Sequence, residues 1–275
     1  MKFELSTRDA VDWLRDLAPE SVDLVITDPA YESLEKHRAI GTTTRLKHSK
    51  ASSNDWFNIF PNARFGELFT EIYRVLKPDT HFYLLCDAET MFVAKPEAEK
   101  AGFRFWKPLI WDKCTIGMGY HYRARYELIL FFEKGKRRLN DLGIADIIEV
   151  PRIRGGYPAE KPVDVAEVLI RQSSEPGEVA ADPFMGSGSV GIAATKLGRR
   201  FLGNDLNPEA VQIALRRLKG QAPSPVGRVP PPFDPAQGAP SDSRGAQPGP
   251  IEADPAKPGT AGDAEPMQAD LLDRA

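Results

Sequence analysis

The residues with the clearest capacity for chemistry are Thr27-Asp28-Pro29-Ala30-Tyr31, which follow the apolar run Val22 to Ile26. That run is short, rich in β-branched residues and followed by a proline, which predicts a buried parallel strand ending in a stiff turn. Ligands of open α/β sheets bind beyond the carboxyl ends of the strands. A carboxylate, a proline with a fixed φ angle and an aromatic ring are therefore expected to form a binding site at such an edge.

An amine on a nucleobase is the substrate that these side chains suit. Such an amine is a poor nucleophile because its lone pair is delocalised into the ring. The Asp28 carboxylate and the Pro29 carbonyl could accept its two hydrogens and turn the lone pair towards an incoming methyl group, while Tyr31 offers a face for an extruded base. The alternative is an ordinary strand-end turn, in which Asp28 caps the next helix and Tyr31 packs nearby. A second motif is needed to decide between the two.

A glycine-rich turn supplies that second motif. Val179 to Asp182 predicts another strand, and Gly186-x-Gly188 lies between it and a helix, where backbone amides can approach a ligand closely. Asp205 lies 19 residues after Gly186, at the end of the next predicted strand, where a carboxylate reaches a ribose diol in nucleoside-binding βαβ units. The motif predicts a nucleoside cofactor, and the alternative is a tight turn with a capping acid. Gly191 completes a Gly-x-Gly-x-x-Gly pattern, so this motif alone leaves NAD open.

Both motifs resemble those of the DNA amino-methyltransferases. Asp182-Pro-Phe-Met-Gly-Ser-Gly188 resembles the S-adenosylmethionine loop of that family, and Thr27-Asp-Pro-Ala-Tyr31 is similar to its Asp-Pro-Pro-Tyr motif. Tyr157-Pro-Ala-Glu-Lys-Pro162 matches in part the element His-Pro-Thr-Gln-Lys-Pro, and Trp111-x-Lys113 with Tyr126 to Lys134 resembles the element between the catalytic and cofactor halves. The resemblance covers residues 1–220. The catalytic motif precedes the cofactor loop, which is the order of the β class and implies a circularly permuted sheet.

The resemblance implies a role for individual residues. The target amine would be held by Asp28, Pro29 and Tyr31, and S-adenosylmethionine by Asp9, Lys161, Asp182, Phe184, Gly186, Gly188 and Asp205. Asp205 would bind the ribose, Lys161 would lie near the carboxylate end of the cofactor, and Asp9 would lie near its adenine ring. The chain departs from the family pattern at Ala30, which replaces a proline and loosens the turn that aims the Pro29 carbonyl, and at Tyr157, where histidine is common.

The activity that the resemblance implies is methylation of DNA. A sulfonium carries an activated methyl group, so the reaction requires neither a metal nor a covalent nucleophile, and the protein contributes positioning and electrostatic stabilisation. The residues Asp28-Pro29-Ala30-Tyr31 form a tetrad. Aspartate at its start favours adenine, since the cytosine-amine enzymes of the family more often carry serine there. The alternatives are cytosine-N4 methylation, a cofactor- and DNA-binding module with weak turnover because of Ala30, and a nicotinamide oxidoreductase. The last leaves the Asp28 tetrad unexplained.

The elements around these motifs alternate between strand and helix, which predicts an α/β fold with a doubly wound, parallel, Rossmann-like methyltransferase sheet. Strands are expected at 2–6, 22–26, 81–86, 105–111, 127–132, 179–182 and 201–203, and helices between Asp9 and Pro19, at 65–76, 89–101, 163–172 and 190–197, and from Asn207 onwards. Residues 32–64 and 113–126 are expected to be DNA-facing loops. The candidate DNA-binding residues in them are Lys36, Arg38, Arg45, Lys47, Arg123 and Arg125.

Composition divides the chain into a methyltransferase domain, 1–220, and a tail, 221–275. The tail holds twelve of the 24 prolines and is rich in alanine and glycine, so it is expected to be disordered. The tail contains four basic and eight acidic residues. Without them the formal net charge changes from −3 for the chain to +1 for the domain, which suits a polyanion such as DNA.

The remaining composition indicates where the protein acts. The N-terminus has no signal-peptide pattern, no run is long enough for a membrane span, and two cysteines are too few for a disulfide framework. We therefore expect a cytoplasmic protein of a bacterium, or of a phage in a bacterial host, without a membrane partner. The resemblance leaves open whether it forms a homodimer and whether a cognate restriction endonuclease accompanies it.

Overall fold

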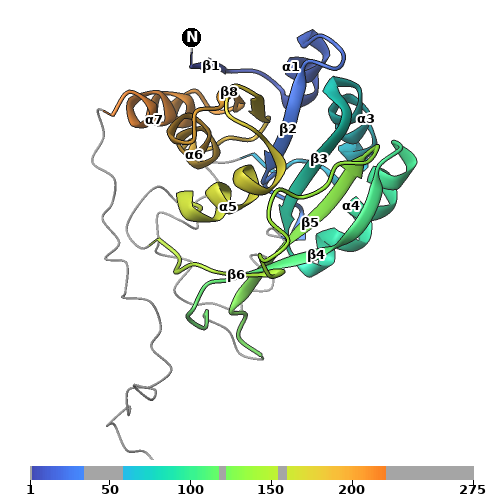
Figure 1. Ribbon diagram of the computed structural model, residues 1–275, viewed down its shortest axis with the longest axis vertical. Coiled ribbons are helices and arrows are strands. Elements are labelled where there is room, and N and C mark those ends of the chain that lie inside the picture. The colour runs from blue at the N-terminus through green and yellow to red at the C-terminus, as the bar shows by residue number, and fades with distance from the viewer. Residues whose placement is uncertain (1, 34–57, 118–121, 154–159, 221–275) are drawn as a thin grey trace, which may run out of the picture. The chain divides into compact units, whose positions relative to one another are not determined.

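The computed structural model describes residues 2–33, 58–117, 122–153 and 160–220 (Figure 1). These residues lie in one compact unit, Met1–Val229, whereas a second unit, Pro230–Ala275, lies outside them. The disorder expected for 221–275 and the domain boundary near residue 220 therefore stay predictions. Within the described ranges no helix combines the length and apolarity needed to cross a membrane.

The core of this unit is one eight-stranded sheet in the order β1-β8-β7-β2-β3-β5-β4-β6. The strands are β1 (Phe3–Ser6), β2 (Val22–Thr27), β3 (Leu76–Cys86), β4 (Arg104–Asp112), β5 (Tyr126–Lys134), β6 (Ile147–Glu149), β7 (Val179–Asp182) and β8 (Arg200–Asn204). The helices are α1 (Ala10–Asp16), α3 (Phe65–Val75), α4 (Ala88–Lys100), α5 (Val163–Ser173), α6 (Ser189–Lys196) and α7 (Pro208–Leu218), with a 3-10 turn, η4, at Asn62–Arg64.

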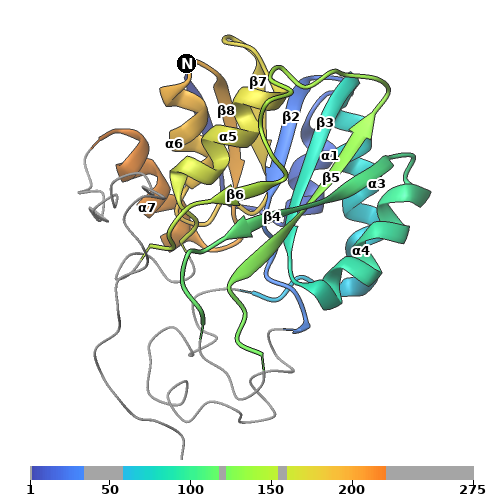
Figure 2. The ribbon, with the colours of Figure 1, turned by 60° about the horizontal axis from the view of Figure 1, so that its bottom comes forward.

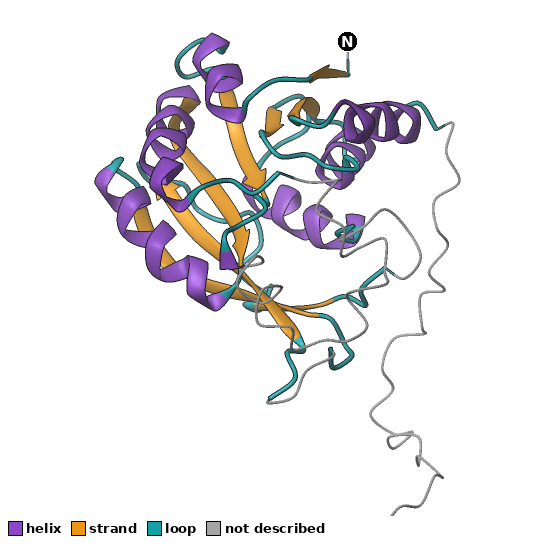
Figure 3. Ribbon diagram, turned by 180° about the vertical axis from the view of Figure 1, so that it is seen from behind, coloured by secondary structure: helices purple, strands orange, loops and turns teal. Residues whose placement is uncertain are grey.

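Helices cover both faces of the sheet (Figures 2 and 3). α1, α3 and α4 pack on one face, and α5, α6 and α7 pack on the other. α3 packs on the sheet through one apolar stripe: its buried residues are Phe65, Leu68, Phe69, Ile72 and Val75, at the spacing of a single helical face. The predicted doubly wound α/β architecture is thus confirmed.

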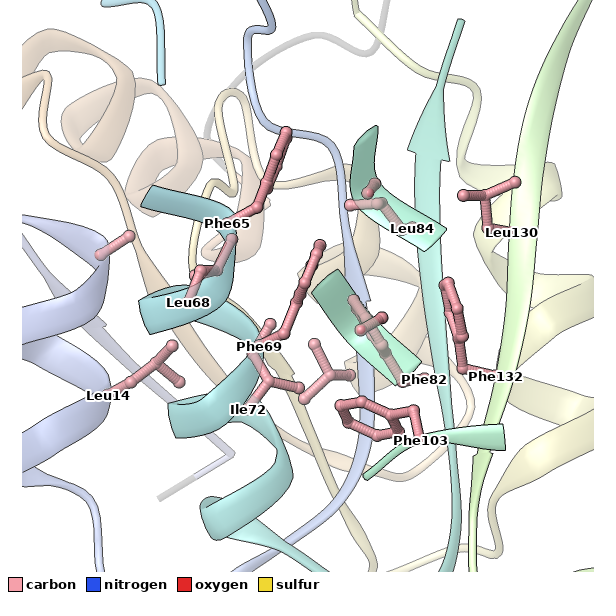
Figure 4. Close-up of a cluster of buried hydrophobic side chains, with 14 of the residues drawn as sticks. Leu14, Phe65, Leu68, Phe69, Ile72, Phe82, Leu84, Phe103, Leu130 and Phe132 are labelled. Carbon is pink, nitrogen blue, oxygen red and sulfur yellow. The ribbon is translucent and has the colours of Figure 1, made fainter. Parts of the chain in front are cut away.

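Aromatic rings fill the layer between α3 and the sheet (Figure 4). Phe65 and Phe69 of α3 stack with ring centroids 5.2 Å apart, and Phe82 of β3 stacks on Phe132 of β5 at 5.4 Å. These rings are fully buried, and side chains of this size contribute about 1.5–3 kcal/mol each on burial. The layer makes the central strands a rigid base for the residues at their ends.

The sheet differs from the prediction at three strands. It is not wholly parallel, because β5 pairs antiparallel with both β3 and β4. β3 begins at Leu76, directly after α3, and so includes Pro78, whose missing N–H is tolerated near the start of a strand. The edge strand β6 was not predicted, since its apolar signal is limited to Ile147 and Ile148.

The strand order places the two motifs side by side. β2 pairs with β7 in parallel, with Leu24 opposite Ala180 and Val25 opposite Ala181, and β7 pairs in parallel with β8. The carboxyl ends of these three strands therefore lie at the same edge of the sheet. The chain reaches β2 before β7, as the sequence predicts, but a circular permutation as the origin of that order stays a prediction.

A buried polar network connects β3 to α5, which packs on the face of the sheet opposite α3. His81 Nδ1 lies 2.7 Å from Ser173 Oγ, and His81 Nε2 lies 3.1 Å from the Arg137 carbonyl oxygen. Tyr83 Oη lies 2.7 Å from the same Ser173 hydroxyl. All three contacts are satisfied when Nε2–H donates to Arg137 and the Ser173 hydroxyl donates to Nδ1 while accepting from Tyr83. Burial lowers the pKa of His81 to about 4, so this ring is neutral at pH 7.

His81→Gln should weaken the acid sensitivity of the fold. The folded-state pKa lies below the unfolded value of about 6.5, so the stabilisation is complete above that pH and is lost as pH falls towards 4. Between pH 7 and pH 5 the urea unfolding free energy of the wild type should fall by on the order of 2 kcal/mol more than that of the variant. Asp182, whose pKa is raised by burial, acts in the opposite direction, but it is common to both proteins and cancels. Parallel pH profiles would contradict this account.

Candidate active site

A cavity of about 400 Å³ opens at the sheet edge where β2, β7 and β8 end. The residues that the sequence assigns to the target amine and to the cofactor line it together: Asp9, Asp28, Pro29, Tyr31, Lys161, Asp182, Phe184, Gly186 and Asp205. Gly188 is the exception, since it is not among the lining residues and packs towards Ala214 of α7. The two motifs, more than 150 residues apart in the chain, thus share one cavity.

A buried hydrogen bond connects the two motifs. Thr27 Oγ1, at the end of β2, donates to Asp182 Oδ1 at 2.7 Å, and the same oxygen accepts the Phe184 N–H at 3.0 Å. Burial raises the pKa of Asp182 to about 8, although both hydrogen bonds oppose that rise. Asp182 therefore holds the start of the glycine-rich turn against the strand that carries the tetrad.

The glycine-rich turn is fixed from the other side by Asp205. The Gly186 N–H donates to Asp205 Oδ2 at 2.9 Å, and the Asn207 N–H donates to Oδ1 at 2.8 Å. Burial raises the pKa of Asp205, and the two backbone hydrogen bonds limit the rise. Ser189, the first residue of α6, also lines the cavity, and its buried Oγ has no hydrogen-bond partner in the described part of the chain. The cavity therefore offers a hydroxyl whose hydrogen bond is still to be made.

One wall of the cavity combines an ion pair with aromatic rings. Asp9, which caps α1 through the Val11 N–H, accepts two hydrogen bonds from Arg64, at 2.7 and 2.9 Å. This pairing lowers the pKa of Asp9. The Arg64 guanidinium lies 5.2 Å from the centroid of the Phe60 ring, which meets Phe184 edge-on at 5.1 Å. The wall presents flat apolar surface beside a carboxylate, which suits a purine ring.

The tetrad turn is held in place despite Ala30. The Phe60 N–H donates to the Ala30 carbonyl at 2.7 Å, and Tyr31 and Phe60 form a parallel bridge. Tyr31 is buried, which raises the pKa of its hydroxyl and keeps it protonated. The returning segment at Phe60 thus restrains the turn that the sequence predicts to be loosened.

Comparisons with known proteins agree with this geometry. A family model described as DNA methylase matches residues 22–152 and 143–216, which together span most of the chain. The chain belongs to this DNA methylase family. The family predicted from the two motifs is thereby confirmed.

Individual relatives of this methylase cover most of its length. DNA adenine methyltransferase YhdJ of Escherichia coli (strain K12) is 27% identical over 250 residues, covering 76% of this chain and 80% of that protein. Type II methyltransferase M2.DpnII of Streptococcus pneumoniae is 25% identical over 246 residues, covering 80% and 91%. The crystal structure of TTHA0409 from Thermus thermophilus, assigned as a DNA modification methylase, matches with a TM-score of 0.61 at 25% identity, covering 80% of this chain and 96% of that one.

Lys161 of this methylase lies against the tetrad. Its Nζ is 2.5 Å from Asp28 Oδ2 and 3.2 Å from Glu127 Oε2, whereas the resemblance places it near the carboxylate of the cofactor. Burial lowers the pKa of Lys161, but the two carboxylates outweigh that effect and raise it above its usual value. The side chain is therefore an ammonium paired with two acids of the protein.

The candidate DNA-binding residues divide into three groups. Lys36, Arg38, Arg45 and Lys47 lie outside the described residues, so their roles stay predictions. Arg123 is exposed in the connection between β4 and β5. Arg125 is exposed too, but its Nε donates to Asp112 at 2.7 Å, and this contact lowers the pKa of that carboxyl. Part of the Arg125 charge is therefore already offset within the protein.

The lining residues that the sequence did not predict include Phe60, Arg64, Glu127 and Ser189. Phe60 and Arg64 lie in the stretch assigned to a DNA-facing loop, and nothing in their spacing indicates a return to the tetrad. Glu127 lies in the segment Tyr126 to Lys134, which resembles an element of the family. The sequence predicted only a strand there and no role in the site. The signal for Ser189 was present, since its hydroxyl follows the Gly-x-Gly turn directly.

Gly188→Ala should destabilise the fold more than Gly177→Ala does. Both glycines have left-handed backbones, at φ +80° and +92°, so each substitution carries about 1 kcal/mol of backbone strain. A Cβ at Gly188 would lie 2.9 Å from the Ala214 Cβ, which adds about 1–3 kcal/mol of overpacking, whereas a Cβ at Gly177 meets nothing within 4 Å.

Urea unfolding of both variants measures this difference. The cost of Gly188→Ala should also shrink in an Ala214→Gly background, because the crowded methyl group is then removed. Equal costs for the two glycines would show that the approach of α7 to the turn is unimportant.

Proposed function

We propose that this DNA methylase transfers a methyl group from S-adenosylmethionine to the exocyclic amine of an adenine flipped out of DNA. The observation that carries the proposal is the single cavity lined by both the Asp28 tetrad and the Gly186 turn. A cavity of about 400 Å³ lies within the range of sites for small molecules and cofactors. Donor and acceptor could therefore meet without a change of domain arrangement.

The lining residues fit S-adenosylmethionine. Asp205 would accept hydrogen bonds from the ribose hydroxyls, and the wall formed by Phe184, Phe60 and Asp9 would receive the adenine ring. The unpartnered Ser189 hydroxyl and the amino end of α6 suit the carboxylate of the methionine part. The bound cofactor would supply a methyl group on a positively charged sulfur.

The tetrad would prepare the target amine. The Asp28 carboxylate and the Pro29 carbonyl would accept its two N–H groups and direct the lone pair towards the methyl group. Asp28 would also stabilise the positive charge that develops on the nitrogen and could take up the proton that the amine releases. The neutral Tyr31 ring would contact the flipped base. The presence of all three residues in the lining of the cavity supports these roles.

Two observations favour adenine over cytosine. The tetrad begins with aspartate, and the E. coli relative is named a DNA adenine methyltransferase. Cytosine-N4 methylation is the second candidate, because the same acceptors could hold that amine. DNA is the proposed substrate, with Arg123 as a contact to its backbone. A homodimer and a cognate restriction endonuclease remain predictions from the family resemblance.

Asp28→Asn should reduce methyl transfer by at least about a hundredfold, because loss of one preorganised group at the developing charge has an effect of this size. The assay follows a radiolabelled methyl group from S-adenosylmethionine into unmethylated DNA, and digestion to nucleosides identifies the product. We expect N6-methyladenine. Cofactor binding, measured by calorimetry, should change less than twofold or so, since Asp28 faces the acceptor side.

Asp146→Asn is the matched control, since it neutralises an exposed aspartate that pairs with Lys107 at 2.5 Å, away from the cavity. It should retain wild-type activity. N4-methylcytosine as the product would replace the adenine assignment, and a wild-type protein that binds the cofactor without methylating any DNA would refute the proposal.

A further inference from the structure

Four charged side chains form an alternating chain that ends at the cavity, where Glu127, Lys161 and Asp28 are lining residues. Lys113 Nζ lies 2.6 Å from Glu127 Oε1, Glu127 Oε2 lies 3.2 Å from Lys161 Nζ, and Lys161 Nζ lies 2.5 Å from Asp28 Oδ2. The side chains are 20–27% exposed, so all four are largely withdrawn from water. Their formal charges cancel, and the chain ends on the carboxylate that the proposed function assigns to the target amine.

The far end of this chain is anchored to the sheet. Glu127 lies on β5 directly opposite Trp111 of β4. The Lys113 ammonium lies 5.4 Å from the centroid of the buried Trp111 ring, and the Lys113 N–H donates to the Arg125 carbonyl at 2.8 Å. Two paired strands therefore position Glu127 and Lys113, whereas Lys161 lies two residues before the start of α5.

Lys161 has few hydrogen-bond donors left for the carboxylate of the cofactor. An ammonium has three donors, and two of them face carboxylates of the protein. A third acid at the same ammonium would lie close to Asp28 and Glu127 and would be repelled by both. The Ser189 hydroxyl, which lacks a partner in the described ranges, offers the methionine carboxylate a place free of that repulsion.

We propose that Lys161 is a positioning residue for Asp28, not a ligand of the methyl donor, and that Glu127, held by Lys113, fixes the Lys161 ammonium in that place. The inference rests on the proposed function and assigns a new role within the same site. Lys161 occupies Oδ2 of Asp28 and so orients the carboxylate, leaving its other oxygen for the amine. Its positive charge also opposes the effect of burial, which favours the protonated acid.

The titration of Asp28 reports directly on this role. Burial raises the pKa of Asp28, and the Lys161 ammonium opposes that rise. Removing the ammonium should therefore move the Asp28 titration to higher pH, and the protonated acid should persist over more of the acid range. The other ionisable groups around Asp28 come from each neighbouring element: Tyr31 in its own turn, Cys86 on β3, Lys113 after β4, Glu127 on β5 and Asp182 on β7.

The test compares K161M, K161R and S189A with K196M as the control. Lys196 is a lysine of α6 that pairs with Glu167 at 2.5 Å on the exposed surface. Three quantities are measured in the full chain: the affinity for S-adenosylmethionine by calorimetry, the pH profile of kcat, and the titration of Asp28 by 13C NMR of carboxyl-labelled aspartate, assigned with D28N.

K161M should raise the Asp28 midpoint by about one pH unit or more and move the acid limb of kcat with it. Its affinity for S-adenosylmethionine should stay within about twofold of wild type. K161R should restore both the midpoint and the limb, because it keeps the positive charge. S189A should show the reverse pattern: affinity weakened by about fivefold, the loss expected for one hydrogen bond, with the titration unchanged. K196M should match wild type throughout.

A second comparison tests Glu127. E127Q should lower kcat severalfold when Lys161 is present but by less than about twofold in the K161M background, since residues that act through one another are not additive. A full effect of E127Q in both backgrounds would overturn its assignment as the anchor of Lys161.

Two further outcomes are decisive. Weaker cofactor binding by K161M with an unchanged Asp28 titration would make Lys161 a donor ligand and overturn the inference. A wild type that transfers no methyl group to DNA would refute the proposed function alone, because the calorimetric and NMR results decide the role of Lys161 without turnover. If K161M fails to fold, as judged by circular dichroism, K161Q provides the same loss of charge and K161R the same rescue.

Discussion

The arrangement of this molecule depends on the hydrogen bond between Thr27 and Asp182. It lies between neighbouring parallel strands, is shielded from water, and joins the residue before the tetrad to the last residue of β7. A slip of one residue between β2 and β7 would turn Thr27 towards the opposite face and leave a buried carboxyl without its partner. The register that gives the sheet its core is therefore the same register that brings both halves of the site together.

The site also contains four aspartates at one sheet edge, and each of them has different partners. Asp9 pairs with Arg64, and Asp28 pairs with Lys161. Asp205 is held by backbone N–H groups, and Asp182 by a hydroxyl and a backbone N–H. The two acids without a cationic partner lie on either side of the glycine-rich turn. Burial raises the pKa of Asp182 to about 8, so this acid is largely protonated at pH 7 and adds little negative charge beside the turn.

Sequence patterns predicted most of the fold because its signals are local. The β-branched run at Val22, the Asn207-Pro208 start of α7 and the apolar stripe of α3 each indicate an element without reference to the rest of the chain. The predicted direction of β5 was wrong, because alternation of strands and helices indicates parallel neighbours, whereas the described residues between β4 and β5 contain no helix. Pairing across the sheet decides that direction, and a single sequence does not show pairing.

The site was predictable to the same degree. Most residues predicted beside the glycine turn or the proline line the cavity because the strand ends place them there, whereas Gly188 does not line it. Side chains that reach it from distant elements were not: Arg64 approaches from η4 and Glu127 from β5. The partner of Lys161 was also missed, because charge alone does not distinguish an ammonium that binds a ligand from one that binds a carboxylate of the protein.

The two ends of the segment between Ser33 and Asn58 are clamped to each other beside the tetrad. Phe60 bonds Ala30, the Asn62 N–H donates to Glu32 at 2.8 Å, and Ser33 Oγ donates to Asp87 at 2.6 Å. These bonds hold the residues on both flanks of 34–57 against each other, so the tetrad and Phe60 keep their relative places through contacts among described residues.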